Sequence, residues 1–65
     1  MKIGEVYHIE TNILIGKTKN NQTFLNGDFK LLDIVGNYLE FSDVLSHIHF
    51  VIGKDSILSC DLLKV

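Results

Sequence analysis

Short apolar runs, separated by glycine and asparagine, cover most of the chain. Ile, Val, Phe and Tyr recur throughout and alanine is absent, so the pattern favours strands over helices. The five glycines are spread at intervals that suit strands joined by turns. The pattern predicts strands at Glu5–Ile9, Ile13–Thr18, Asp28–Val35, Tyr38–Val44, His47–Ile52 and Leu62–Val65. It predicts turns at Asn20–Gln22 and Asn26–Asp28, and one 3₁₀ or α-helical turn at Ser56–Cys60.

The segment Val35–Tyr38 carries the strongest local signal. Its central Gly-Asn pair lies between two apolar runs, which is typical of a two-residue type I′ or II′ hairpin loop. Such a loop fixes the register of the hairpin, so we expect Ile34 to face Leu39 and Leu32 to face Phe41. These four side chains would form one apolar face.

The opposite face of this hairpin is mixed. The same register pairs Val35 with Tyr38, Asp33 with Glu40, Leu31 with Ser42 and Phe29 with Val44. In an antiparallel sheet with one solvent-exposed face, apolar and polar residues alternate more regularly along each strand. We therefore expect a folded-over strand or another chain to cover part of this face. The predicted protein-binding residues are therefore Phe29, Leu31, Asp33, Val35, Tyr38, Glu40 and Val44.

Asp33 and Glu40 form a carboxylate pair in the middle of this face. Like charges directly across a strand pair cost roughly 0.2–1 kcal/mol. The two carboxylates can remain solvated, hold a cation, or receive a lysine or arginine from a partner. The sequence leaves these roles open.

The hairpin resembles the central hairpin of SH3-like barrels, over Gly27–Ile34, the Gly36-Asn37 loop and Tyr38–Phe41. The closing segment Ser56–Val65 is similar to the 3₁₀ turn and last strand of that fold. The resemblance implies an all-β fold, a single small SH3-like barrel domain over residues 1–65, with five to six short antiparallel strands. The chain departs from peptide-binding SH3 domains, which have an aromatic-rich groove, and from Sm-like proteins, which have a basic or aromatic RNA pocket.

The size and charge of the chain limit the classes of function that it can have. The chain has 65 residues, a net charge of −2 and one cysteine, so it has no internal disulfide. A domain this short buries only about 60% of its unfolded surface, which favours a protein partner or a homo-oligomer. No apolar run is long enough to span a membrane, and the start of the chain does not resemble a signal peptide. We expect a cytoplasmic protein, in the host cytoplasm if it is viral.

Side chains that could carry chemistry are few. His47 and His49 would share one face of a strand, about 6–7 Å apart, and that spacing can grip a metal. A third ligand is not specified by spacing, so we expect no metal and no cofactor. Ser56, Ser59 and Cys60 lack a positioned base, so we expect no enzymatic activity.

A nucleic-acid interface is the alternative. Lys17, Lys19 and Asn20 would contact phosphate, and Tyr7, Phe24 or Tyr38 would stack on bases. The sequence pI of about 5.8 and the absence of arginine disfavour it, because nucleic-acid domains usually carry a basic stripe.

The sequence therefore predicts a non-enzymatic protein-interaction module, with a Sm-like or KOW-like nucleic-acid-binding domain as the alternative. Lysine supplies every positive side chain, and Asn and Ile are abundant. This composition resembles that of small phage accessory proteins. The resemblance implies a phage-encoded inhibitor or modulator of a host protein.

Overall fold

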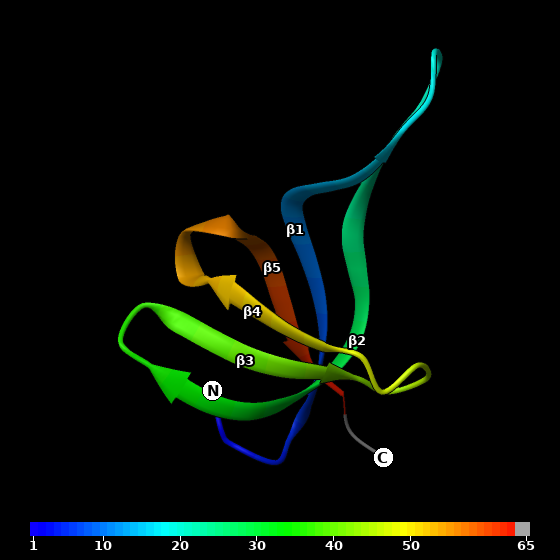
Figure 1. Cartoon of the computed structure of the whole chain (residues 1–65). Coiled ribbons are helices and arrows are strands. Elements are labelled where there is room, and N and C mark those ends of the chain that lie inside the picture. The colour runs from blue at the N-terminus through cyan, green and yellow to red at the C-terminus, as the bar shows by residue number, and fades with distance from the viewer. Residues whose placement is uncertain (64–65) are drawn as a thin grey trace.

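A computed structural model describes residues 1–63, which form one antiparallel sheet (Figure 1). The elements are β1 (Val6–Lys17), β2 (Gln22–Val35), β3 (Tyr38–Asp43), β4 (His49–Gly53), the 3₁₀ turn η1 (Lys54–Ser56) and β5 (Ile57–Leu62). The sheet order is β4-β3-β2-β1-β5. The prediction of an all-β chain with one short 3₁₀ turn is confirmed.

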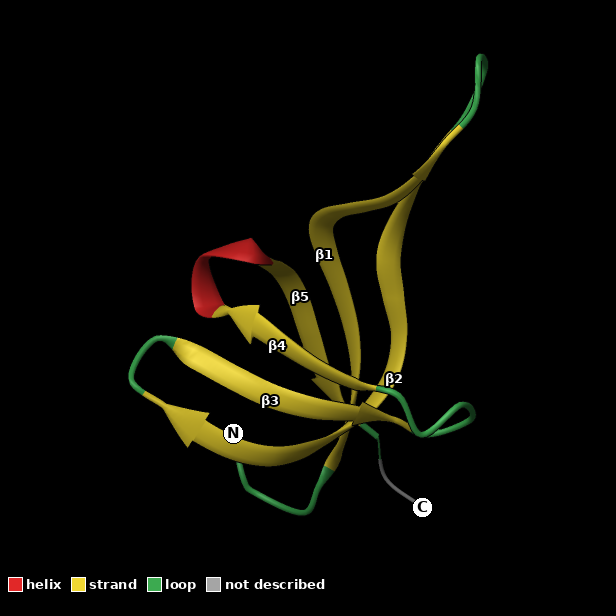
Figure 2. Ribbon diagram, in the orientation of Figure 1, coloured by secondary structure: helices red, strands yellow, loops and turns green. Residues whose placement is uncertain are grey.

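The sheet curls but does not close. The strand order places β4 at one edge and β5 at the other, and the 3₁₀ turn connects these two edge strands (Figure 2). A closed barrel has no edge strands. The curled open sheet is therefore the architecture that residues 1–63 adopt.

β1 is one long bent strand where the sequence predicts two. Its pairing with β2 shifts between Glu10 and Leu14 and again between Leu14 and Gly16. Thr11 holds the bend, because its buried hydroxyl donates to the Leu25 carbonyl at 2.7 Å and accepts from the Ile13 N–H at 3.1 Å. The bend lets β1 pair with both β2 and β5 and still extend into a hairpin.

The predicted turn at Asn26–Asp28 is wrong, since this segment lies inside β2. Gly27 pairs with Ile9 of β1, and a Cβ atom at Gly27 would lie 3.4 Å from the Phe29 ring. A side chain at this position would be in ordinary van der Waals contact with that ring, so the glycine marks a position within a strand rather than a turn.

The C-terminal elements begin earlier than the sequence predicts. The 3₁₀ turn lies at Lys54–Ser56 and the last strand at Ile57–Leu62. The polar Lys-Asp-Ser stretch suits a turn, which leaves the apolar residues after it for the strand. Lys64 and Val65, the end of the predicted last strand, lie outside the described residues.

The two-residue loop of the β2–β3 hairpin is confirmed. Val35 faces Tyr38 and Asp33 faces Glu40, and Gly36 has a φ of 58°, which glycine adopts without strain. The register then shifts by one residue between Leu31 and Asp33, so that Leu31 faces Phe41.

This β-bulge at Leu32 overturns part of the predicted register. An extra residue in one strand exchanges the two faces beyond it. Leu32 does not face Phe41, and Val44 does not face Phe29, which pairs with Asp43 instead. Phe29 and Leu31, expected on the surface, are fully buried.

The core lies inside the curl of the sheet. The largest fully buried side chains are Phe29, Phe41, Ile9, Leu31, Leu39 and Ile52. The Phe29 ring packs against Phe41 with 6.0 Å between centroids, and edge-on against Phe50 at 5.6 Å. This geometry adds to the burial of the rings themselves.

The hairpin between β1 and β2 projects from the rest of the sheet (Figure 1) and contributes to a longest dimension of 38 Å. Residues 13–24 make up this projection, which we call the arm. Its turn is held by a hydrogen bond of 2.8 Å from the Thr18 N–H to the Asn21 carbonyl, in agreement with the predicted turn near Asn20.

Truncation of the central aromatic ring tests this core. We expect Phe41→Ala to reduce the free energy of unfolding by about 3–5 kcal/mol, because it leaves a cavity beside Phe29. Urea denaturation measures the loss. Val51→Ala on the exposed side of β4 is the control and should change stability by no more than about 0.5 kcal/mol. Equal effects of the two variants would contradict this core.

Candidate functional site

Three large side chains stand exposed together on the outer face of the β2–β3–β4 sheet. Val35, Tyr38 and Val51 are 66%, 59% and 67% exposed. Val35 faces Tyr38 across the hairpin, and Val51 faces Glu40, two residues from Tyr38 on the same side of β3. Asp33 and Glu40 lie on the same side of these strands. We call the surface formed by Asp33, Val35, Tyr38, Glu40 and Val51 the Tyr38 face.

The carboxylate pair lies within this face, as the sequence predicts. Asp33 faces Glu40, and the Asp33 carboxylate accepts a hydrogen bond of 2.8 Å from the Ile34 N–H. Among residues 1–63 neither carboxylate forms an ion pair. Two negative groups beside three apolar side chains give the Tyr38 face a mixed chemistry.

Four of the seven predicted protein-binding residues belong to the Tyr38 face, namely Asp33, Val35, Tyr38 and Glu40. The other three do not. Phe29 and Leu31 are buried in the core, and Val44 follows the end of β3 in the loop to β4. Sequence reasoning missed Val51, although its alternation with the core residues Phe50 and Ile52 would have placed it on the outer face.

The β3–β4 loop forms a second exposed apolar feature. The Asp43 carboxylate accepts from the N–H groups of Leu45 and Ser46 at 2.8 and 2.9 Å, and these hydrogen bonds hold the pKa of Asp43 below its ordinary value. They fix the loop with Leu45 91% exposed at its tip. An Asp side chain that accepts hydrogen bonds from backbone N–H groups shortly after it is typical of a turn, and sequence reasoning missed this one.

The two candidate metal-binding histidines do not share a strand. His47 lies in the loop with a φ of 60°, and β4 begins at His49. The prediction that both histidines lie on one face of a strand is therefore wrong. Across residues 1–63 no three side chains of the metal-binding types gather at one point.

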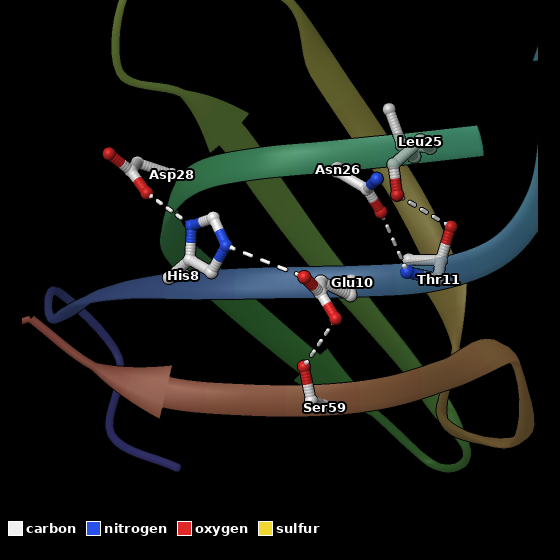
Figure 3. Close-up of polar contacts among 7 residues, drawn as sticks. All are labelled: His8, Glu10, Thr11, Leu25, Asn26, Asp28 and Ser59. Carbon is white, nitrogen blue, oxygen red and sulfur yellow. Dashed lines mark hydrogen bonds and ion pairs between the residues drawn. The ribbon is translucent and has the colours of Figure 1, made fainter. Parts of the chain in front are cut away.

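A third histidine lies in a polar cluster on the outer side of β1 (Figure 3). His8 Nδ1 lies 2.8 Å from a carboxylate oxygen of Asp28, and Nε2 lies 4.0 Å from Glu10. Ser59 donates to the other Glu10 oxygen at 3.3 Å. The hydrogen bond to Asp28 raises the pKa of His8 above its ordinary value of 6.5, and the neighbouring carboxylates add to this effect. The cluster is solvent-exposed and links β1 to β2 and β5.

The candidate nucleic-acid residues separate into two groups. Lys17, Lys19 and Asn20 lie at the tip of the arm, with Phe24 on its stem. Tyr7 is buried, and its hydroxyl accepts from the Lys2 N–H at 2.7 Å, so it is not available for stacking.

Tyr38 lies at the other end of β2 from the arm, opposite Val35. It therefore does not join the lysines. The arm does have a distinct charge, since the sequence contains no acid between Glu10 and Asp28.

Comparisons with family models, with characterised proteins and with solved structures gave no match. In residues 1–63 no helix is long and apolar enough to cross a membrane.

The His8 cluster makes a testable contribution to pH dependence. Because the folded pKa of His8 is raised, its contribution to stability is complete below pH 6.5 and is lost as the pH rises through the folded value. We expect Asp28→Asn to lower the His8 pKa and to reduce this pH dependence, because Asp28 is the largest cause of the raised pKa. An NMR titration of the His8 ring measures the pKa, and Asp33→Asn is the control. An unchanged His8 pKa in Asp28→Asn would contradict the assignment.

Proposed function

We propose that this domain is a non-enzymatic protein-interaction module that binds its partner through the Tyr38 face. The observation that carries the proposal is the exposure of Val35, Tyr38 and Val51 on adjacent, hydrogen-bonded strands. Tyrosine is enriched at protein interfaces, because its ring supplies contact area while its hydroxyl remains able to form hydrogen bonds. The strands fix these side chains in position, so binding orders little additional chain.

The carboxylates define the chemistry of the partner. A lysine or arginine reaching Asp33 and Glu40 would relieve the repulsion between them, while an apolar side chain packs on Tyr38. Such ion pairs set specificity and association rate more than affinity. The proposed partner is therefore a protein surface with an apolar group flanked by basic side chains.

The proposal includes the SH3-like barrel as the finer description of the fold. The curled antiparallel sheet and the 3₁₀ turn directly before β5 support it. It also includes the role suggested by the lysine-only composition, a phage-encoded modulator that binds a host protein and inhibits it.

A second candidate function is nucleic-acid binding by the arm. One observation favours it: the arm has two lysines and no acid, while a partly exposed Phe24 lies on its stem. Lysines would contact phosphates as single point charges, and Phe24 would stack on a base.

The first proposal is tested with the immobilised domain and a bacterial lysate, since the resemblance to phage proteins implies a bacterial host. We expect the proteins retained by the parent domain to be lost with Tyr38→Ser and with Glu40→Lys, as quantified by mass spectrometry. Each loss should be about tenfold or more, because central aromatic anchors carry much of the binding energy. Ile15→Ser removes an equally exposed apolar side chain from the arm and is the matched control. Retention of the same proteins by all variants would refute binding through the Tyr38 face.

The second candidate is tested with a fluorescent single-stranded oligonucleotide. If the Tyr38 face is the functional surface, we expect no change in anisotropy at physiological salt. Binding that weakens steeply with salt and disappears in Lys17→Gln/Lys19→Gln would instead establish the arm as a phosphate-binding element. The same double variant should leave the lysate result unchanged.

A further inference from the structure

The arm exposes apolar side chains that the rest of residues 1–63 leave uncovered. Leu14 on β1 is 46% exposed, and Phe24 on β2 is 38% exposed. Two paired strands alone bury little apolar surface, and the arm projects away from the curled sheet that holds the core (Figure 1). Neighbouring apolar side chains that stay exposed and are bordered by polar groups mark an interaction surface.

One side of the arm combines an apolar row with a positive charge. Leu14 lies opposite Phe24, and Lys17 lies opposite Gln22. Residues paired across two antiparallel strands point to the same side. The extra residue of this region is Ile15 in β1, so β2 alternates regularly and its Phe24 and Gln22 share a side. The Leu14–Phe24 row and Lys17 therefore stand on one side of the arm, separated along β2 by two residues, roughly 7 Å.

The Tyr38 face has two rows with the same spacing and the opposite charge. Val35 lies opposite Tyr38 in the apolar row. Two residues further along each strand, again roughly 7 Å, Asp33 lies opposite Glu40, with Val51 beside them on β4. Within residues 1–63 no lysine forms an ion pair with either carboxylate. The two surfaces are therefore complementary in charge and in the order of their rows.

We propose that the Tyr38 face binds the arm of a second copy of this chain, an inference that rests on the proposed function of that face and names its partner. When the apolar row of the arm packs on the Tyr38 ring, Lys17 reaches the two carboxylates. Lys19, in the turn two residues further along, adds a second positive charge. These lysines relieve the repulsion between Asp33 and Glu40, and no acidic residue of the arm opposes them.

The arm and the Tyr38 face of the same chain are too far apart to meet. β2 runs from Gln22, at the turn of the arm, to Val35, at the Gly36-Asn37 loop, so the two surfaces lie at its opposite ends (Figure 1). A contact between two different surfaces is heterologous, because each copy offers its arm to one neighbour and its Tyr38 face to another. Such copies assemble head to tail, into a ring or into an open chain.

Self-association is measured by analytical ultracentrifugation of the whole chain over about 10 µM to 1 mM at physiological salt, since a hairpin on one face buries a small interface. We expect a mass that rises with concentration. Lys17→Glu, which sets like charges in contact, and Tyr38→Ser, which removes the ring, should each weaken association about tenfold or more. Lys2→Glu and Leu45→Ser are the matched controls, with the same substitutions outside both surfaces, and should associate as the parent does.

A mixture of the two weakened variants provides a measurement that shows both are folded. Lys17→Glu keeps an intact Tyr38 face, and Tyr38→Ser keeps an intact arm. We therefore expect equal amounts of the two to form a 1:1 complex, although each alone is monomeric at the same concentration. The complex stops at two chains, because its remaining arm and its remaining face are the altered ones. Absence of a complex in the mixture would overturn the head-to-tail contact.

Other outcomes separate this inference from the proposed function. A parent chain that stays monomeric at about 1 mM, or variants that weaken association no more than their controls, would overturn self-association. If Tyr38→Ser still loses the lysate proteins in that case, the Tyr38 face binds a different protein and the proposed function stands. A monomeric parent whose arm binds the oligonucleotide would instead assign the arm to nucleic acid.

Discussion

The extra residue that β2 inserts at Leu32 determines which side chains fill the core of this small domain. On one side of the bulge, Asp33 and Val35 lie on the outer face with Tyr38 and Glu40. On the other side, the exchange of faces turns Phe29 and Leu31 inward, where the two aromatic rings pack. Without the bulge, those two large apolar side chains would be in water, and Phe41 would lose its partner in the core.

The open sheet is the second constraint. It has two edge strands, β4 and β5, and its outer face is not covered by another layer of the described residues. Bending of β1 at Thr11 wraps the sheet around the core without joining β4 to β5. The arm carries two lysines and no acidic residue, and every acidic residue of the chain lies outside it. Exposed apolar side chains therefore collect on distinct surfaces, the Tyr38 face, the Leu45 loop and the β5 edge, rather than in one cavity.

The proposed function rests on these exposed surfaces. The histidine whose pKa is raised, His8, is held by Asp28, and both residues line an open hollow together with Asp43 and Leu45. The Tyr38 face and the β5 edge lie on different strands.

The sequence by itself determined the all-β class, the Gly36-Asn37 loop and the presence, but not the position, of a 3₁₀ turn before the last strand, because these follow from local preferences of a few adjacent residues. It also placed Asp33, Val35, Tyr38 and Glu40 on one face, since they lie close to that loop. The tertiary structure alone decided the bulge at Leu32, the burial of Phe29 and Leu31, and the continuity of β1 and β2 through apparent turns. Those features depend on long-range packing against Phe41 and Ile9. The alternation of apolar and polar residues along a strand does not show where an extra residue exchanges the two faces.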